Sequence, residues 1–249
     1  MSIFDAHLHI IDKRFPVVQN QGYMPDSFTV DDYLNQTQHL DIQGGAVVSG
    51  SFQGFDQTYL TEALRQLGDH FVGVTQLPYS TPDHEIIRLH QSGVRALRFN
   101  VNRGGSADIS KLDYFSKRVH ELVGWRTELY INASDLQEII SMVKGLPAVS
   151  IDHLGLSKSA LPNVLNLVDK GVKVKAAGFG RVDFNPAEVV KKIYDIHPGS
   201  LMFGTDLPST RAPRPFQTAD IEMIQDCLGS EEAIHRVLYK NAAEWYKLL

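Results

Sequence analysis

Short hydrophobic runs rich in β-branched residues recur eight times along the chain. They occupy residues 3–9, 46–51, 71–77, 94–100, 127–132, 148–153, 172–178 and 201–206. Between these runs, apolar side chains recur at the i, i+3, i+4 and i+7 positions of a helix, as at Leu60, Ala63, Leu64 and Leu67. The pattern predicts eight strands that alternate with amphipathic helices.

Alternation of strands and helices predicts a parallel sheet, because each helix returns the chain to the same end of the sheet. Eight such units in 249 residues match a distorted (β/α)8 TIM barrel with an additional C-terminal helix, and an open doubly wound sheet is the alternative. The sequence has no G-x-G-x-x-G turn after its first predicted strand, no linker and no repeat. We therefore expect a single barrel domain over residues 1–249.

The connection after the first predicted strand is unusually long. Residues 10–29 separate it from the first predicted helix and include Pro16, Gly22 and Pro25. Long ordered loops frequently cover a binding site. In a barrel this loop lies at the C-terminal ends of the strands, where barrel enzymes hold their active sites.

The composition narrows the classes of partner. The chain is 43% hydrophobic and 21% charged, and its net charge of −5 without a basic run argues against a nucleic-acid partner. Its apolar runs are too short to span a bilayer and its N-terminus lacks the pattern of a signal peptide, so we expect a cytoplasmic protein without membrane contact. Cys227 is the sole cysteine, which excludes an internal disulfide.

Polar residues stand at the ends of three predicted strands. His7 and His9 share one side of the first strand because side chains alternate, His153 ends the sixth strand, and Asp206 ends the eighth. Taken singly, each residue is adequately explained by a hydrogen bond to a loop or by a turn cap. A barrel gathers its strand ends at one opening, however, so the four residues together favour a shared active site.

Arginines near other strand ends suggest an anionic substrate. Arg98 lies near the end of the fourth predicted strand, Arg103 lies in the loop after it, and Arg181 follows the seventh strand. A guanidinium binds a carboxylate through two parallel hydrogen bonds. The alternative to substrate binding is that these arginines lie in loops and contact only solvent, and this alternative is strongest for Arg103. We expect a small anionic or polyhydroxylated substrate.

Beyond these separate residues, the chain resembles the amidohydrolase superfamily, and within it the amidohydrolase-2 branch that contains 2-pyrone-4,6-dicarboxylate lactonase and sugar-acid lactonases. The resemblance spans nearly the whole chain. It rests on six segments: Phe4-Asp-Ala-His-Leu-His9, Tyr23-Met-Pro25, Gly93-Val-Arg-Ala-Leu-Arg-Phe-Asn100, Ile151-Asp-His-Leu-Gly155, Val174-Lys175 with Gly178, and Phe203-Gly-Thr-Asp-Leu-Pro208.

The resemblance implies that the barrel hydrolyses a C–O or C–N bond at its strand ends. Asp206 would be the general base that takes a proton from water, with His153 beside it in catalysis. His7, His9, His153 and Asp206 would hold a divalent metal, whereas in metal-free relatives the histidines bind and polarise the carbonyl. By the same resemblance, the substrate contacts would come from Arg98, Arg181, Arg103, Tyr23 and Ser51.

The sequence leaves two alternatives for the cofactor. A binuclear centre generally needs a bridging carboxylate or a modified lysine at the fourth strand, and residues 97–100 provide neither. His7 and His9, completed by His153 or Asp206, match a three-ligand catalytic zinc site with one open position. Nearby arginines oppose a dication, because like charges in a dry pocket repel strongly. One zinc ion is the expected cofactor, and metal-free catalysis is the alternative.

The expected function is hydrolysis of a lactone that carries a carboxylate or several hydroxyl groups. One alternative in the same superfamily is metal-dependent decarboxylation of an aromatic or unsaturated acid. Another is a barrel that binds a metabolite without turnover, which the three histidines and Asp206 disfavour. The branch often has Trp and His around the proline where this chain has Leu207 and Ser209, so no relative's substrate is carried over. A homo-oligomer is compatible with the sequence.

Overall fold

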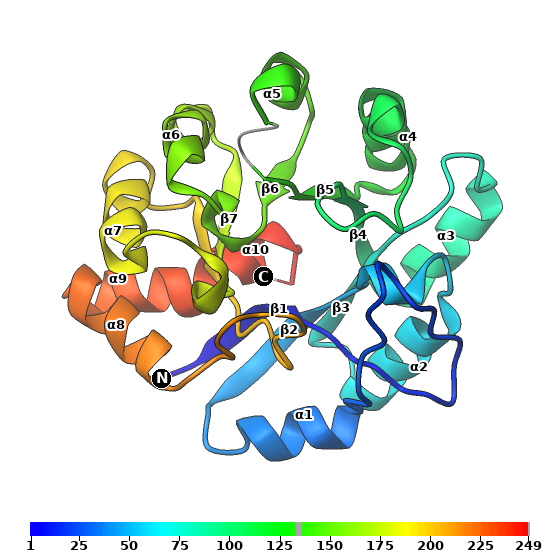
Figure 1. The fold of residues 1–249 in the computed structure, drawn as a ribbon, viewed down its shortest axis with the longest axis horizontal. Coiled ribbons are helices and arrows are strands. Elements are labelled where there is room, and N and C mark those ends of the chain that lie inside the picture. Colours follow the sequence, from blue (N-terminus) through cyan, green and yellow to red (C-terminus); the bar gives the residue numbers. More distant parts are fainter. Residues whose placement is uncertain (133–135, 249) are drawn as a thin grey trace.

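Residues 1–132 and 136–248, which the computed structural model describes, form eight strands and ten α-helices (Figure 1). The strands are β1 (Ile3–Leu8), β2 (Ile42–Val48), β3 (Phe71–Thr75), β4 (Val94–Asn100), β5 (Arg126–Tyr130), β6 (Val149–Ile151), β7 (Lys173–Ala176) and β8 (Leu201–Phe203). The helices are α1 (Val30–Thr37), α2 (Thr58–Leu67), α3 (Asp83–Gln91), α4 (Leu112–Val123), α5 (Leu136–Lys144), α6 (Leu161–Val168), α7 (Pro186–Ile196), α8 (Ala219–Leu228), α9 (Glu231–His235) and α10 (Asn241–Trp245). All eight predicted strands are present. β2 begins earlier than predicted, because two glycines interrupt its hydrophobic pattern.

The strands form one parallel sheet in the order β1 to β8, with the helices in a ring outside it (Figure 1). The segment after β8 completes the circle: Asp206 N donates to His7 O at 2.7 Å, and His9 N donates to Leu207 O at 2.7 Å. This approach requires Gly204, since a β-carbon there would lie 2.7 Å from His7 N. The expected (β/α)8 barrel is confirmed.

Two apolar layers hold the barrel together. The larger layer packs between the strands and the surrounding helices, where most of the buried Leu, Ile and Val side chains lie. The smaller layer lies inside the barrel and is built largely from Ala and Val. The expected C-terminal helix, α10, adds Ala242, Ala243 and the following Tyr246 to this inner layer. In Figure 1 it lies in red behind the strands.

The barrel interior also holds charged residues below the strand ends. Lys175 Nζ lies 2.5 Å from Glu128 Oε2, and the Tyr246 hydroxyl donates to Glu128 Oε1 at 2.5 Å. All three residues are fully buried. An unpaired charge in such surroundings is costly, so loss of either Lys175 or Glu128 would leave the other destabilising the fold.

No helix among the described residues is both long and apolar enough to cross a membrane.

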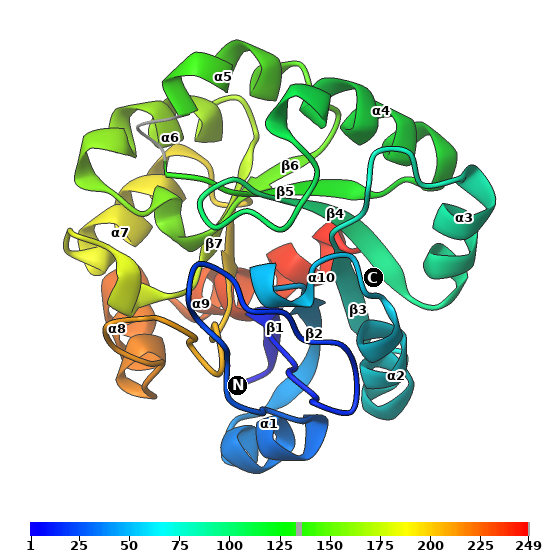
Figure 2. The same ribbon diagram turned by 45° about the vertical axis from the view of Figure 1, so that its right-hand side comes forward.

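The long loop between β1 and α1 is folded back on itself. Ile11 and Phe28 pair through backbone hydrogen bonds of 2.7 and 2.8 Å, and Val18 N donates to Phe52 O in the segment after β2. Thr29 and Asp32 then form a capping box that begins α1. Figure 2 shows this loop, in dark blue, running away from the end of β1 before it reaches α1.

Candidate active site

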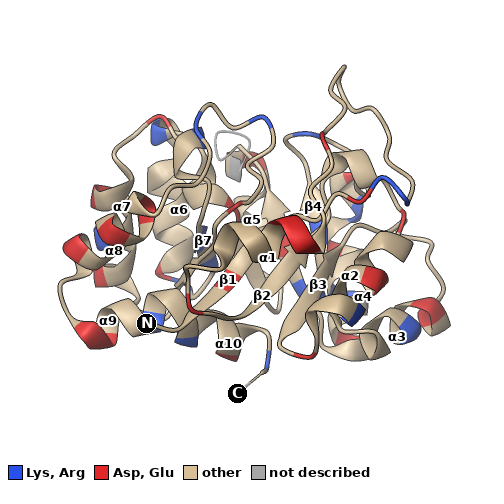
Figure 3. Ribbon diagram, turned by 90° about the horizontal axis from the view of Figure 1, so that it is seen from below, with Lys and Arg blue, Asp and Glu red and all other residues tan. Residues whose placement is uncertain are grey.

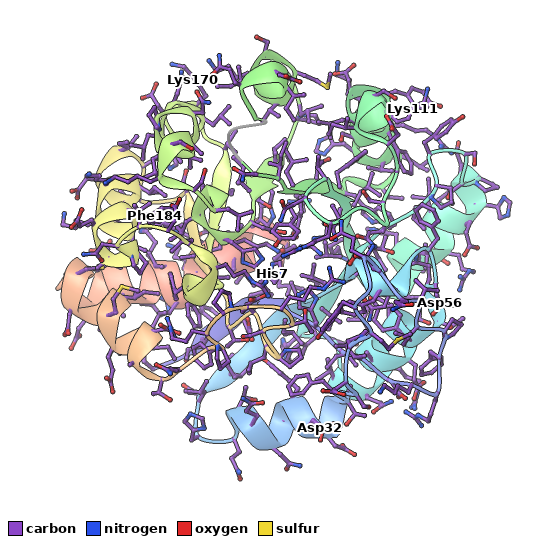
Figure 4. All side chains as sticks on the ribbon, in the orientation of Figure 1. His7, Asp32, Asp56, Lys111, Lys170 and Phe184 are labelled. Carbon is purple, nitrogen blue, oxygen red and sulfur yellow. The ribbon has the colours of Figure 1, made fainter. Side chains whose placement is uncertain are left out.

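Three histidines surround one carboxylate oxygen at the C-terminal end of the barrel. The Nε2 atoms of His7, His9 and His153 lie 3.9, 3.6 and 3.9 Å from Asp206 Oδ1. All four side chains are buried, and Figure 4 labels His7 near the centre of the ring of helices. The structure therefore brings together the four strand-end residues that the sequence singled out.

Two of these residues reach the centre through unusual backbone conformations. His153 has φ 53° and Asp206 has φ 61°, both in the left-handed region that residues other than glycine rarely adopt. Such conformations cost about 1–3 kcal/mol each and persist only where surrounding contacts enforce them. Asp206 is held by backbone hydrogen bonds on both sides, from its N to His7 O and from Ser209 N to its own O at 2.6 Å.

Neighbouring groups fix the orientation of two imidazoles. His9 Nδ1 lies 2.7 Å from Val48 O, a group that only accepts, so Nδ1 carries the proton and Nε2 an electron pair. His7 Nδ1 faces Asp152 Oδ1 at 3.5 Å, which favours the same tautomer. Both Nε2 atoms thus direct electron pairs at the space beside Asp206.

The convergence fits a divalent cation. His7 Nε2 and Asp206 Oδ1 are buried and have no hydrogen-bond partner among the described residues. Two atoms that bind one Zn²⁺ at about 2.0–2.2 Å cannot lie more than about 4.4 Å apart, and Asp206 Oδ1 meets this limit with both Nε2 atoms. Ligand atoms of His7, His9 and Asp206 lie within 4.8 Å of one another. The Nε2 electron pairs of His7 and His9 repel the negative charge of Asp206. A cation between them would remove this repulsion, so the three residues are suited to hold one.

Charges around the cluster set its protonation. Burial lowers the pKa of His153 to about 4 and that of His7 well below its usual value. Burial alone would raise the pKa of Asp206, but the Arg181 guanidinium, followed by His153, holds it far below the usual range. At neutral pH, His7 and His153 are therefore neutral imidazoles and Asp206 is an ionised carboxylate.

Two of the predicted substrate-binding arginines are already paired with carboxylates. Arg98 Nη2 lies 2.8 Å from Asp152 Oδ2, and its Nη1 donates to Ser49 O at 2.7 Å. Arg181 Nε lies 2.6 Å from Asp206 Oδ2. Both arginines line the same cavity as His9 and His153, but their charges are compensated within the protein.

The other three predicted substrate contacts lie farther out. Ser51 and Arg103 line the cavity, and Ser51 Oγ donates to Asn20 Oδ1 at 3.0 Å. Tyr23 is not among the described residues that line it; instead, its ring lies 4.4 Å from the Arg211 guanidinium carbon. The cavity is lined by His9, Gly50, Ser51, Phe52, Arg98, Asn100, Arg103, Tyr130, His153, Arg181, Thr210 and Arg211.

Sequence reasoning missed four residues that shape the site. Asp152 joins Arg98 to His7, and its position directly before His153 was the available signal. Tyr130 ends β5, and its ring lies 5.1 Å from that of His153. Asn20 and Arg211 lie in loops, outside the segments that carry the family resemblance, so no sequence pattern distinguished them.

The fold and this geometry define a (β/α)8-barrel enzyme with a His and Asp centre at its strand ends. The chain belongs to the amidohydrolase family, whose Amidohydro_2 model, described as amidohydrolase, matches residues 4–248. The resemblance seen in the sequence motifs is confirmed, as is the prediction of an amidohydrolase-type hydrolase.

Individual relatives are distant. A 2-pyrone-4,6-dicarboxylate hydrolase of Comamonas testosteroni is 29% identical over 157 residues, 61% of this chain and 51% of that protein, so the match spans about half of that relative. A 4-sulfomuconolactone hydrolase of Rhizobium radiobacter is 22% identical over 271 residues, 99% of this chain and 90% of that one. A solved structure, a probable 2-pyrone-4,6-dicarboxylic acid hydrolase from Acinetobacter baumannii with citric acid bound, has a TM-score of 0.83 at 20% identity and covers 99% of this chain and 100% of that one. The structural likeness supports the fold alone.

Proposed function

We propose that this protein hydrolyses a lactone that carries an acidic group, with Asp206 as the general base. The observation that carries the proposal is the convergence of three imidazoles on Asp206 Oδ1 beside Arg98 and Arg181. Relatives named as hydrolases of 2-pyrone-4,6-dicarboxylate and 4-sulfomuconolactone support an acidic lactone as substrate.

We also propose one divalent ion, with zinc as the expected metal, held by His7, His9 and Asp206. When bound, the ion would polarise the substrate carbonyl and lower the pKa of nearby water. The tautomer of His9 supports this role. A neutral imidazole with its proton on Nδ1 has no proton on Nε2, so the Nε2 electron pair is available to bind a metal ion. Asp152 and the Val48 carbonyl would then orient the two histidine ligands through their Nδ1 atoms, on the side of each ring away from the metal.

In the proposed reaction, water attacks the carbonyl carbon of the lactone and Asp206 takes the proton that water loses. The ring C–O bond then breaks, and the same proton passes from Asp206 to the departing ring oxygen. The product is a ring-opened hydroxy acid, or its keto form where that oxygen is enolic. Arg98 and Arg181 would orient the substrate's acidic group, and neutral His153 would stand beside the reacting carbonyl.

Replacement of the base tests this proposal. Wild-type protein should hydrolyse members of a panel of carboxylated and polyhydroxylated lactones, and Asp206→Asn should reduce the rate roughly 10²- to 10⁴-fold. Asp195→Asn is the matched control, since Asp195 is an exposed residue paired with Lys191 on α7. Undiminished hydrolysis by Asp206→Asn would remove the assigned base. Release of CO₂ from an aromatic acid, without lactone opening, would favour the decarboxylase alternative.

A further inference from the structure

Four basic side chains gather at the end of the barrel where the strands begin, opposite the candidate active site. Arg95 stands near the start of β4, Arg126 begins β5, His90 lies in the last turn of α3, and Lys247 follows α10. Within residues 1–132 and 136–248, no carboxylate lies within ion-pair distance of any of them. Burial, and after it the charges of Arg95 and Lys247, lower the pKa of His90. Figure 3 shows α10 and the C-terminus at this end, with a basic residue in blue on the segment that leads to the C-terminus.

The backbone brings three of these charges close together. In the sheet, Ala96, directly after Arg95, is the partner of Arg126. Arg126 Nη1 donates to Gly124 O at 2.6 Å, and a β-carbon on Gly124 would lie 3.6 Å from Lys247 Nζ. Arg126 and Lys247 therefore lie beside the same glycine, with Arg95 on the neighbouring strand.

Both arginines are anchored through only part of their donors. Arg95 Nη1 donates to His90 O at 2.7 Å and to Val94 O at 2.9 Å, whereas its Nε and Nη2 donate to no residue that the structure describes. Arg126 is 8% exposed, and its guanidinium carbon lies 5.5 Å from the centre of the Trp245 ring. Because these contacts restrict both side chains in advance, little freedom is lost when a ligand binds.

Two buried N–H groups beside these charges have no acceptor. Arg126 Nε and Trp245 Nε1 are shielded from solvent and have no hydrogen-bond partner in the described part of the chain. Nearly all buried donors in proteins are paired, so such exceptions indicate a missing partner. A water molecule would accept hydrogen bonds from these groups but would leave the positive charges uncompensated. An oxyanion would do both.

A cavity at the same end of the barrel gives access to Arg95. Arg95 and Leu248 line it, together with the turns before β3 and β4. Asp69, in the first of these turns, also lines the cavity and forms no ion pair with the described residues. Leu248 directly follows Lys247, which is exposed. Movement of this short segment would extend the cavity toward Arg126.

We propose that Arg95, Arg126 and Lys247 form a binding site for a multivalent oxyanion of the phosphate class, at the end of the barrel opposite the active site. The free N–H groups of the two arginines and Trp245 Nε1 would donate to the oxyanion, which would join the segment after α10 to the starts of β4 and β5. Several uncompensated charges favour a dianion over a monocarboxylate. A ligand that binds only the folded chain also stabilises it.

The two tryptophans of the chain provide a readout at the site itself. They are Trp125, whose Nε1 donates to His90 Nδ1 at 3.2 Å, and Trp245. Neither lines the active-site cavity. A proton–nitrogen NMR spectrum therefore contains two indole signals, which Trp245→Phe assigns. On titration with inorganic phosphate at constant ionic strength, the Trp245 indole proton should move downfield and saturate with a Kd of about 1 mM or lower.

Charge-removing variants separate this site from the positive charge at the active-site opening. Arg95→Gln should weaken phosphate binding about 10- to 100-fold, because a charged hydrogen-bond donor is lost. Lys247→Gln, at an exposed position where folding is not at risk, should weaken it about two- to fivefold. Arg103→Gln, at the active-site cavity, and Lys191→Gln, at an exposed position on α7, should leave the titration unchanged.

Three results would overturn the inference. The first is a Trp245 signal that does not move in the full chain up to about 50 mM phosphate. The second is equal phosphate affinity in wild type and Arg95→Gln, and the third is acetate that binds as tightly as phosphate.

Glycerol 3-phosphate distinguishes the two sources of the ligand. If it binds more tightly than inorganic phosphate, the site takes a phosphorylated metabolite, and the reverse order identifies the free ion. The titration needs no substrate and no turnover, so its outcome is independent of whether the protein opens a lactone.

Discussion

Arg181 Nε lies 2.6 Å from Asp206 Oδ2, so the proposed base is ion-paired in the free protein. This contact keeps Asp206 ionised, but a carboxylate with so low a pKa is a weak base. A substrate carboxylate that draws Arg181 toward itself would leave Asp206 in a buried site, where desolvation raises its pKa. Substrate binding would then increase the basicity that catalysis needs.

The Arg181→Gln variant tests this coupling. We expect its KM for acidic lactones to rise at least about 10-fold, because a charged hydrogen-bond partner is lost. Its pKa for Asp206 should rise, since burial then dominates, and activity should fall at a higher pH during acidification than in wild type. Profiles of kcat/KM from pH 4 to 8 measure the shift, with Arg214→Gln, whose arginine pairs with Asp220, as the control. If kcat/KM falls at the same pH in Arg181→Gln and in wild type as the solution is acidified, the coupling is contradicted.

Asp152 links a substrate-binding arginine to a histidine of the centre. Asp152→Asn should lower the free energy of unfolding by about 3–5 kcal/mol, because it leaves Arg98 buried without a counter-ion. Urea denaturation measures this loss. The double variant Asp152→Asn/Arg98→Met should recover part of it, since both charges are then absent. Loss of less than about 1 kcal/mol in the single variant would argue that the pair is solvated.

Metal content follows from the electron pairs of the centre. Purified protein should contain about one divalent ion per chain. His9→Ala should lose most of this metal, because the two ligands that remain, His7 and Asp206, bind a metal ion more weakly than three ligands do. Chelator treatment should abolish lactone hydrolysis, and zinc should restore it. His84→Ala, at an exposed position on α3, is the control. Full activity of the metal-free protein would support the alternative in which the histidines act directly on the carbonyl.

Asp5 should make stability depend on pH. Burial raises its pKa to about 6, although Thr205, His7 N and Tyr33 donate to it. Between about pH 4 and 6 the folded state therefore binds more protons than the unfolded state, and this contribution to stability falls as pH rises, by up to about 3 kcal/mol.

Asp5→Asn removes that titration while keeping an oxygen acceptor. Relative to wild type, the variant should become progressively more stable as pH rises from 4.5 to 7, in urea denaturation of chelator-treated protein. Asp26→Asn, at an exposed position, should show a constant difference. A constant difference for Asp5→Asn as well would show that Asp5 does not titrate in this range.

The barrel was predictable because its signals are local and repeated. Eight hydrophobic runs, separated by helical periodicity, allow few arrangements once each strand must be buried on both faces. The termini of the strands were less predictable, as at β2, where Gly44 and Gly45 provide no hydrophobic side chain although they are buried. Convergence of His7, His9, His153 and Asp206 also followed from sequence, since each stands where a strand ends.

The architecture and the types of residue at the opening therefore follow from local sequence patterns. Which of the charges remain unpaired depends on how the folded chain brings them together. Arg98 and Arg181 are neutralised by carboxylates 54 and 25 residues away in the chain, whereas Asn20 brings Arg103 and Arg211 together across 83 and 191 residues. Electrostatic energy depends on distance in space, and separation along the chain carries no information about which guanidinium meets a carboxylate and which remains available for a ligand.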